Sequence, residues 1–402
     1  MNGSVKLLAP LVAALAVAAC NAGGSSNVPG TAGEASSPSS SRSTMPEWQA
    51  KGLAKAACPQ AAGKATCLAL IQSKSGISPA VSGWAPSDFQ TRYNLPSSTN
   101  GKGQIVAIVD AYDNPNVASD VAAYRSQFGL GTANFTKYNQ QGQKKNYPRG
   151  STGWGVEIDL DVQMVSAACP LCTIYLVEAN SSDFGDLQTA EAEAVTLGAH
   201  IVSNSWICYG SYDCVDQSIF DQPGVLYTAG SGDAGYGAIG APSALSSVVA
   251  VGGTVLSKNG STYSESVWNG AGAGCATGVT KPSWQHDPDC TSRTDSDVSA
   301  ISWQVAEYDT YGYSGWFTVG GTSVATPMVA AIFALAGNAS SQDAAKKIWS
   351  LKKRKRGKDL HAITTGSDGS CNGEYLCQAG TKQFHSYSGP AGWGTPNGIK
   401  TF

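Results

Sequence analysis

Histidine and charge are both scarce in this chain. Only four of its 402 residues are histidines, and Asp, Glu, Lys and Arg together make up 14%, with a formal net charge of −3. This composition argues against nucleic acid or an acidic membrane surface as a partner. One short basic run, residues 352–358, has no interleaved aromatic residues and predicts a solvated surface loop. No apolar run beyond residue 20 has the length needed to span a bilayer, which excludes a later transmembrane helix.

The first 19 residues are typical of an export signal. Residues 1–6 carry one positive charge, and residues 7–19 form an apolar run that ends in small residues before Cys20. The sequence VAAC at residues 17–20 is similar to a bacterial lipobox, in which the cysteine is lipidated, and ordinary signal-peptide cleavage is the alternative. Residues 20–45 are rich in Gly and Ser and predict a flexible linker. We therefore expect an extracytoplasmic protein, either secreted or anchored to a bacterial membrane as a lipoprotein.

The eleven cysteines indicate the same kind of compartment. Assigning Cys20 to a lipid leaves ten, which fall into five pairs that are close in sequence, as expected of disulfides in an oxidising compartment. A zinc site is the competing interpretation of Cys169 and Cys172, but neither a second such pair nor a nearby histidine completes four ligands. The predicted disulfides are Cys58–Cys67, Cys169–Cys172, Cys208–Cys214, Cys275–Cys290 and Cys371–Cys377.

Two parts of the chain follow the linker. Residues 46–84 predict a short pro-region or N-terminal extension, with little regular structure in its disulfide-closed part, 47–82. In residues 85–402, buried apolar strands alternate with helical patterns, which predicts an α/β fold with a doubly wound, mostly parallel sheet and helices on both faces. We expect strands at 104–109, 173–177, 200–203, 224–229 and 248–251, and helices at 116–128, 154–168 and 184–197.

The stretch GGTSVATP, from Gly320 to Pro327, contains the first candidate for catalysis. Ser323 follows two glycines and precedes the apolar run 328–335, so it lies where a helix begins. Backbone N–H groups are free there and the helix dipole favours negative charge, which suits a nucleophile whose own N–H binds an oxyanion. A simple helix cap is the alternative, because serine is among the preferred caps.

A serine nucleophile needs a base, and no histidine fits that role. Asp110 ends an expected strand and could pass for the aspartate of a subtilisin-type triad, but that triad needs a histidine between Asp110 and Ser323 at the start of a helix. The four histidines lie before a buried strand, in a cysteine-bounded loop or beyond the serine: His200, His286, His361 and His385.

Carboxylates on one helix offer another base. Glu157 and Asp161 are four residues apart in GWGVEIDLDVQM, so a helix places them on one face, while Asp159 points elsewhere. Their neighbours are apolar, and two acids in a low-dielectric setting cannot easily both ionise, so the pair titrates jointly. Glu157 could then accept the serine proton, with Asp161 orienting it. An exposed acidic helix face is the alternative.

A third acid, Asp233, lies in AGSGDAGYG just beyond the strand expected at 224–229. As a protonated acid it could donate a hydrogen bond to a developing oxyanion. A turn aspartate beside glycine is the alternative interpretation.

In this order, these residues resemble the sedolisins, or serine-carboxyl peptidases. The resemblance extends from QTRYNLPSSTNGKGQIVAIVDAYDNPN to GWGTPNG and implies a subtilisin-like fold. It also implies that Glu157 is the general base, Asp161 the acid that orients it, Asp233 the oxyanion-stabilising acid and Ser323 the nucleophile. Subtilisins share the core of GGTSVATP, but the acidic element around Glu157, together with SGDAG, excludes them.

The chain departs from the sedolisins in two respects. Those proteins usually bind calcium near the C-terminus, and this chain has Ala362 and Ser388 in place of two of the carboxylates. We therefore expect calcium to be absent or weakly bound, with Asp359 and Asp368 as poor substitutes. Sedolisins also often carry a long folded propeptide. Here, inhibition before activation would rest on residues 47–82 or would not operate.

The sequence thus predicts an exported, acid-acting endopeptidase, acting as a monomer on proteins or peptides through an acyl-enzyme on Ser323. It predicts no nucleic-acid partner. The alternative is a surface lipoprotein that keeps the fold for binding and has no turnover. The substrate side-chain preference, and the choice between internal cleavage and removal of tripeptides, stay open.

Overall fold

The computed structural model describes Met1, Gly3 and residues 46–73, 80–338, 344–369, 371, 375–380 and 387–402. The chain forms two units, residues 1–42 and 43–402, and all helices and strands named below belong to the second. Except for Met1 and Gly3, the expected signal peptide and linker lie outside the described residues, as do Cys20 and His385. Within the described ranges, no helix has both the length and the apolar character needed to cross a membrane.

An eight-stranded sheet forms the centre of the second unit. Its strands follow the order β12-β11-β9-β7-β4-β6-β5, and β15 pairs with β11. All of these pairings are parallel except that of β11 with β12. The bounds are β4 Ile105–Ala111, β5 Asn134–Asn139, β6 Thr173–Ala179, β7 Ile201–Asn204, β9 Leu226–Gly230, β11 Val248–Asn259, β12 Thr262–Val267 and β15 Val298–Ile301.

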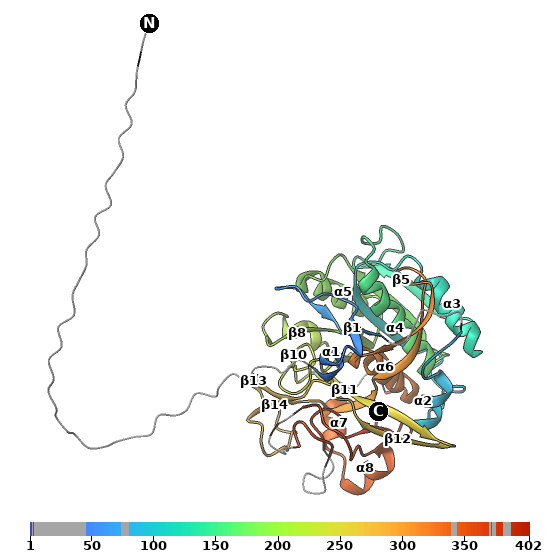
Figure 1. The fold of residues 1–402 in the computed structure, drawn as a ribbon, viewed down its shortest axis with the longest axis vertical. Coiled ribbons are helices and arrows are strands. Elements are labelled where there is room, and N and C mark those ends of the chain that lie inside the picture. Colours follow the sequence, from blue (N-terminus) through green and yellow to red (C-terminus); the bar gives the residue numbers. More distant parts are fainter. Residues whose placement is uncertain are drawn as a thin grey trace, which may run out of the picture. The chain divides into compact units, whose positions relative to one another are not determined.

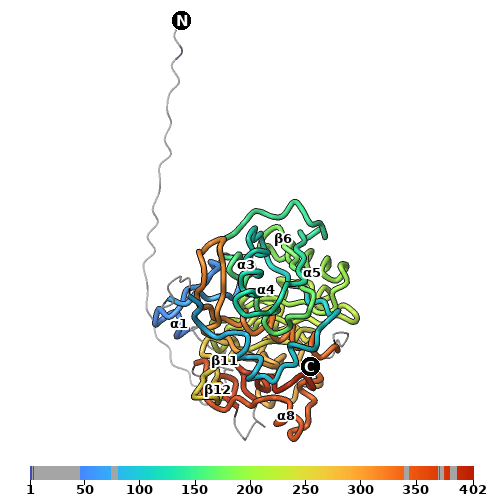
Figure 2. The backbone as a smooth tube through the Cα atoms, turned by 90° about the vertical axis from the view of Figure 1, so that its right-hand side faces the viewer, coloured from blue at the N-terminus to red at the C-terminus, as the bar shows by residue number. Residues whose placement is uncertain are grey.

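Helices cover both faces of this sheet, as the alternation along β4 shows. Val106 and Ile108 pack into one hydrophobic core, and Ala107 and Val109 pack into another on the opposite face. The first core includes α3 (Val117–Phe128), α4 (Thr152–Ala168) and α6 (Thr322–Ala336), and the second includes α5 (Phe184–Thr196). Figures 1 and 2 label α3, α4 and α5 in the same part of the second unit. The predicted doubly wound α/β architecture is confirmed, and each strand and helix expected in 104–251 is present.

Shorter elements surround the central sheet. Four small sheets have the orders β1-β3-β17-β16, β10-β8-β2, β13-β14 and β18-β19. The remaining strands are β1 Ala54–Ala56, β2 Thr66–Cys67, β3 Leu70–Gln72, β8 Trp206–Tyr209, β10 Gly240–Ala241, β13 Gly274–Thr280, β14 Ser292–Asp295, β16 Trp303–Asp309, β17 Gly315–Gly320, β18 Leu360–His361 and β19 Thr395–Pro396. The remaining helices are α1 Glu47–Ala50, α2 Pro86–Arg92, η1 Gln217–Phe220, α7 Ala344–Trp349 and α8 Lys353–Asp359.

The N-terminal segment, residues 46–73, differs from the sequence prediction of little regular structure. It contains α1 and the strands β1, β2 and β3. The strand β2 pairs with β8, and β3 pairs with both β1 and β17. Its strands are two or three residues long, and two of their three pairings are with strands more than a hundred residues away, so local sequence gave a weak signal.

The basic run at 352–358 also differs from its prediction. It forms α8 and not a surface loop. The Arg356 guanidinium lies 3.6 Å from the centroid of the Trp393 ring, where an aromatic face attracts a cation. The neighbouring lysines remain exposed, so the run is solvated as expected but helical.

All five predicted disulfides are present with the predicted pairing. The zinc interpretation of Cys169 and Cys172 is therefore wrong, because the two sulfur atoms are bonded to each other.

Candidate active site

Ser323 lies at the start of α6, directly after the turn that ends β17. The N-cap of this helix is Gly321, with φ 114°, so Ser323 is the second helical residue and not the cap. A glycine is needed at the cap, because a Cβ there would lie 1.9 Å from the carbonyl oxygen of Leu68 and 2.8 Å from Oδ2 of Asp233. The Ser323 hydroxyl is fully buried and has no hydrogen-bond partner among the described residues.

The helix α4 carries the paired acids. It begins after Ser151, whose Oγ accepts a hydrogen bond from the Trp154 N–H, and every residue from 154 to 168 is buried. Glu157 and Asp161 are both 0% exposed. An exposed acidic helix face is therefore excluded.

Glu157 faces both the nucleophile and the N-terminal segment. Its Oε2 accepts hydrogen bonds from the backbone N–H groups of Leu68 and Ala69, at 2.8 and 2.7 Å. Burial raises the pKa of Glu157 well above its ordinary value, and the charge of Asp110 adds to this, while the nearby Ser323 hydroxyl and the Ala69 N–H oppose it. No direct hydrogen bond of good geometry joins Glu157 to Ser323, and Oε1 of Glu157 has no partner among the residues that the structure describes. A proton acceptor thus lies beside the serine.

Asp161 lies one turn further along α4. Its Oδ1 accepts a hydrogen bond from the Ser205 hydroxyl at 2.7 Å, and its Oδ2 has no partner among the described residues. Burial raises its pKa well above the ordinary value, followed by the charges of Asp110 and Glu157. The structure gives no direct hydrogen bond from Asp161 to Glu157, so an orienting role for Asp161 stays a prediction.

Asp233 follows β9, and its two carboxylate oxygens have different surroundings. Oδ1 accepts hydrogen bonds from the Thr322 N–H at 2.8 Å and the Thr322 hydroxyl at 2.9 Å. Oδ2 is buried, has no partner in the described part of the chain, and faces the position beside Gly321 that the Leu68 carbonyl oxygen also approaches. Burial raises the pKa of Asp233 to about 8, so the carboxyl carries a proton at acidic pH. A protonated Oδ2 can donate to a carbonyl oxygen there.

The three described histidines lie elsewhere. His286 and His200 are exposed, and a ring nitrogen of His200 lies 3.2 Å from the Gly224 carbonyl. A ring nitrogen of His361 lies 3.0 Å from the Arg92 carbonyl oxygen. None of these observations brings a histidine to Ser323.

Sequence reasoning missed several neighbours of these side chains. It did not place Thr322 on Asp233, Ser205 on Asp161, or any part of the N-terminal segment on Glu157. It also assigned no role to Asp110, whose charge raises the pKa of both Glu157 and Asp161. The apolar run ATCLALI, residues 65–71, was the available signal for the segment, since such a run is typical of a buried strand.

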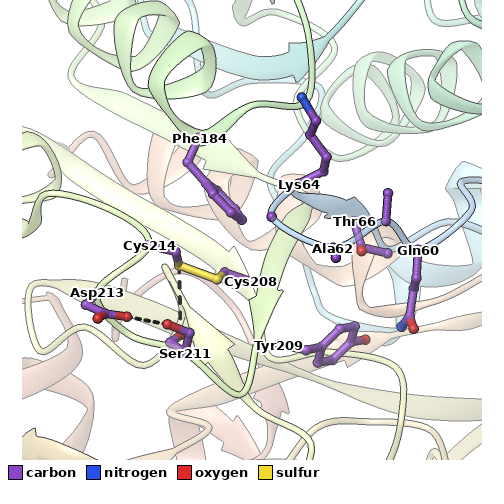
Figure 3. A pocket seen from close by; sticks show the side chains of 12 residues that line it. Gln60, Ala62, Lys64, Thr66, Phe184, Cys208, Tyr209, Ser211, Asp213 and Cys214 are labelled. Carbon is purple, nitrogen blue, oxygen red and sulfur yellow. Dashed lines mark hydrogen bonds between the residues drawn. A yellow bond between two sulfur atoms is a disulfide. The ribbon is translucent and has the colours of Figure 1, made fainter. Parts of the chain in front are cut away.

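Two pockets lie between the N-terminal segment and the rest of the second unit. One, of about 610 Å³, is lined by Gln60, Lys64, Phe184 and Tyr209 and by the Cys208–Cys214 disulfide (Figure 3). The other, of about 870 Å³, lies between the segment and the Asp233 loop and is lined by Trp48, Leu68, Leu70 and Tyr209. Both border the position that β2 occupies beside β8.

A second group of acids lies further along α4. Oxygens of Asp120, Asp159 and Asp309 are all within 4.8 Å of one another. Thr310 donates to both oxygens of Asp120, and the Tyr311 N–H donates to Asp309. Calcium takes six to eight oxygen ligands, so three carboxylates, all of which already accept hydrogen bonds, do not make a site that we assign to a metal.

The residues of the expected C-terminal calcium site do not fit that ion. Ala362 has no ligand atom, and the Ser388 hydroxyl donates a hydrogen bond to the Gln378 carbonyl at 2.7 Å. Neither Asp359 nor Asp368 belongs to a group of three acidic, histidine or cysteine ligands in the described ranges. We therefore assign no calcium to this chain.

Burial of so many acids predicts a fold that is more stable at acidic pH. Burial raises the pKa of Asp309 to about 6, and that of Asp110 and Asp233 to about 8, from 3.8. Each binds its proton more tightly in the folded chain, so its contribution to the free energy of unfolding is complete below about pH 4 and is lost as pH rises through the folded pKa. We expect the thermal unfolding midpoint to be roughly 5 °C lower, or more, at pH 8.5 than at pH 4.5.

A matched variant checks the cause of this difference. Glu307 is fully buried, both of its oxygens are unpartnered within the described structure, and burial, then the charge of Asp159, raises its pKa well above the ordinary value. Glu307→Gln removes one titrating proton and should lessen the fall in the midpoint. An equal or higher midpoint at pH 8.5 in the unaltered chain would show that these carboxyls do not control stability.

Comparisons with known proteins found sequences and structures similar to this chain. The model of the subtilase family matches residues 132–365. Kumamolisin from Bacillus sp. (strain MN-32) is 26% identical over 371 residues, which cover 80% of this chain and 64% of kumamolisin. Sedolisin from Pseudomonas sp. (strain 101) is 24% identical over 356 residues, which cover 78% and 60%. The chain thus spans less than two thirds of the length of either curated relative.

Solved structures show the same fold. The structure of Pseudomonas sedolisin, a serine-carboxyl proteinase complexed with two molecules of pseudo-iodotyrostatin, gives a TM-score of 0.65 at 23% identity, covering 79% of this chain and 96% of that one. Sphericase gives a TM-score of 0.50 at 18% identity, covering 78% and 97%.

Proposed function

Because the chain belongs to the subtilase family, among its sedolisin-like members, we propose that it is a serine-carboxyl endopeptidase that cleaves proteins and peptides. The observation that carries this proposal is the position of the unpartnered Asp233 oxygen, buried within reach of a carbonyl oxygen beside the start of α6. Only a protonated acid can serve as a donor there, which fits a peptidase that works at acidic pH.

The reaction begins at Ser323. Its Oγ attacks the carbonyl carbon of a bound peptide, and the hydroxyl proton passes to Glu157. The tetrahedral oxyanion receives hydrogen bonds from the protonated Oδ2 of Asp233 and from the Ser323 N–H, which belongs to the unpaired first turn of α6. Both donors are in place before the charge develops.

Collapse of the tetrahedral intermediate breaks the peptide C–N bond. Glu157 returns its proton to the leaving nitrogen, and the N-terminal part of the substrate stays bound to Ser323 as an ester. Water then attacks this ester, with Glu157 as the base, and the free serine is restored. Burial, then the charges of Asp110 and Asp233, raise the pKa of Glu157, so the carboxyl can hold the serine proton until the leaving amine takes it.

The five disulfides support a place outside the cytoplasm, since such bonds persist in oxidising compartments. We propose that residues 1–19 direct export, that the protein is secreted or held at a bacterial membrane by a lipid on Cys20, and that it acts as a monomer. The mass of the protein from the membrane fraction distinguishes the lipidated form from the secreted one.

The proposed function predicts a bell-shaped pH profile with its maximum below neutrality. Activity should fall as pH rises towards and through the Asp233 pKa, about 8, because the ionised carboxylate cannot donate to an oxyanion and repels it. It should fall at low pH when the acids around Glu157 bind their last proton. Initial rates on a denatured, dye-labelled protein from pH 3 to 9, with Ser323→Ala as the blank, measure both limbs. A maximum above neutrality would contradict the mechanism, and no activity at any pH would favour the binding lipoprotein.

A further inference from the structure

Residues 344–358 concentrate the positive charge of this chain. They contain eight of its 26 Lys and Arg residues and none of its 29 Asp and Glu residues, so the net charge of −3 is the sum of a basic stretch and an acidic remainder. The stretch forms α7 and α8, which only residues 350–352 separate and which Figure 1 labels in the same part of the second unit. The overall charge, which argues against an acidic membrane surface as a partner, therefore does not describe this part of the surface.

The basic side chains of the two helices form one exposed surface. Burial, and then the charge of Lys355 on α8, lower the pKa of Lys347 on α7, so ammonium groups of both helices lie close enough to repel each other. Lys347 is partly buried, but most of its basic neighbours in α7 and α8 are exposed. Six exposed side chains make up what we call the basic face: Lys346, Lys352, Lys353, Arg354, Lys355 and Lys358.

Buried contacts fix both helices to the rest of the fold. Every apolar residue from 344 to 351 is buried. The indole N–H of Trp349 donates a hydrogen bond to Oδ1 of Asp297 at 2.6 Å, and the Arg356 guanidinium stacks on the Trp393 ring. The basic face is therefore a fixed feature of the folded chain.

The charges of α8 have no counter-charge among the described residues. The ion pairs found there are made by Lys and Arg residues of other segments: Lys51, Lys64, Arg92, Lys137, Lys258, Lys281 and Arg293. Lys352 and Arg356 are four residues apart, as are Arg354 and Lys358, and like charges at this spacing destabilise a helix. A bound anion would relieve this repulsion, so the arrangement favours a partner with negative charge.

The kinds of side chain on the basic face favour a bilayer over a nucleic acid. Five of the six are lysines, and an ammonium group lacks the planar fork with which arginine reads a phosphate or a base edge. The one aromatic residue of α7 and α8, Trp349, is buried, so this face has no ring on which a base could stack. No apolar side chain of residues 344–358 is exposed, so contact with a bilayer would be with its headgroups and not with its hydrocarbon.

The proposed export also brings this chain to a membrane. A lipid on Cys20 would be joined to residue 46 by a covalent path of at most roughly 90 Å, at about 3.5 Å for each residue. A folded unit with the length of residues 43–402 is on the order of 50 Å wide, so that path lets the basic face contact the bilayer that holds the lipid. A lipid and a polybasic surface together anchor a protein more stably than either does alone.

We propose that the basic face docks the folded unit on a bilayer by binding anionic phospholipid headgroups. This goes beyond the proposed peptidase function and does not depend on it. The attraction is electrostatic, between the exposed ammonium and guanidinium groups and the headgroup phosphates, and no covalent bond forms or breaks. Docking in this way would hold the second unit in one orientation on the membrane surface.

The docking is tested by sedimentation of the full chain with vesicles of phosphatidylcholine, alone or with about 30% phosphatidylglycerol, at about pH 6 and low salt. One variant neutralises the basic face with four changes: Lys352→Gln, Lys353→Gln, Lys355→Gln and Lys358→Gln. The control variant has the same change at four exposed lysines elsewhere, none of which forms an ion pair in the described chain: Lys55, Lys102, Lys144 and Lys145. Residues 1–19 and any lipid on Cys20 act equally on both kinds of vesicle, so the ratio of the two affinities isolates the effect of charge.

The unaltered chain should bind anionic vesicles at least about 30-fold more tightly than neutral ones, and 0.5 M salt should remove most of this preference by screening the charges. The variant of the basic face should lose at least about 30-fold in affinity for anionic vesicles, and the control less than about 3-fold, although both change the net charge equally. Unchanged affinity in the first variant, or equal losses in the two, would overturn the proposal. If the first variant lost binding to a duplex DNA fragment but kept its binding to vesicles, the face would be assigned to a nucleic acid instead.

A second measurement needs no variant. Acetylation of the unaltered chain by acetic anhydride, followed by mass spectrometry, should be at least about 5-fold slower at Lys353 and Lys355 with anionic vesicles than with neutral ones, because bound headgroups cover these amines. The rate at Lys102 and Lys145 should not change. Equal protection at all four lysines, or none at the first two, would contradict docking through the basic face. Neither measurement uses peptide cleavage, so a chain without peptidase activity would overturn the proposed function and leave this inference intact.

Discussion

Replacing Ser323 with alanine, or Glu157 with glutamine, is expected to lower the rate of peptide cleavage by roughly 10⁴- to 10⁶-fold. The first change removes the attacking oxygen, and the second leaves an amide that cannot accept the serine proton. Because the two groups act as one unit, the double variant should be little slower than either single one. Rates on a denatured, dye-labelled protein, measured at the pH optimum, give all three values.

Asp159→Asn is the matched control for Glu157→Gln. It makes the same carboxyl-to-amide change on the same buried helix, but Asp159 contacts Asn114 and the second acidic group instead of the serine. We expect less than about a 10-fold loss in rate. If Asp159→Asn were as damaging as Glu157→Gln while both chains unfolded at similar temperatures, the assignment of Glu157 as the base would be lost.

The second large effect concerns the acid that binds the oxyanion. Asp233→Ala should lower kcat by about 10²- to 10³-fold, the usual consequence of removing one such donor. Asp233→Asn should behave differently, because an amide donates without a titrating proton. If its N–H₂ faces the site, activity at acidic pH should be largely kept, and the fall towards pH 8 should move to higher pH or disappear.

Glu191→Gln controls for a general effect of removing a buried acid. Glu191 is also fully buried with a pKa raised by burial, but it lies on α5, which packs against the other face of the sheet. Its substitution should leave the alkaline limb in place. An alkaline limb that is the same in the unaltered chain and in Asp233→Asn would show that another group sets it.

The sequence predicted the central fold, and the placement of the four candidate site residues on helices and turns, because both depend on local patterns. The buried strands are apolar runs. Glu157 and Asp161 are four residues apart, so any helix places them one turn apart on the same face. Asp233 lies in a glycine-rich turn after β9, at the carboxyl edge of the parallel sheet. Ser323 instead begins a helix after β17, which belongs to a small antiparallel sheet, so only the glycines before it marked its position in the sequence.

Long-range contacts could not be predicted in this way. The Thr322 hydroxyl donates a hydrogen bond to Asp233, and the Ser205 hydroxyl donates one to Asp161. Both bonds form only after strands that are far apart in sequence have paired. The same is true of β2 and β3, whose pairing with β8 and β17 no local pattern encodes. The helix α8 was missed for another reason: its polar residues show no apolar period, and one of its contacts with the fold is the stacking of Arg356 on Trp393.

The pairing of β1 with β3 ties the N-terminal segment together before it meets the rest of the fold. The register joins Ala54 to Gln72 and Ala56 to Leu70, and β3 also pairs with β17 while β2 pairs with β8. The segment is therefore held by strand pairings with two separate sheets, and it can leave Glu157 only when both pairings open together. Exchange of the Leu68 and Ala69 amide hydrogens, which the Glu157 carboxylate binds, should accordingly be slow and should quicken together with that of residues 70–71 on warming.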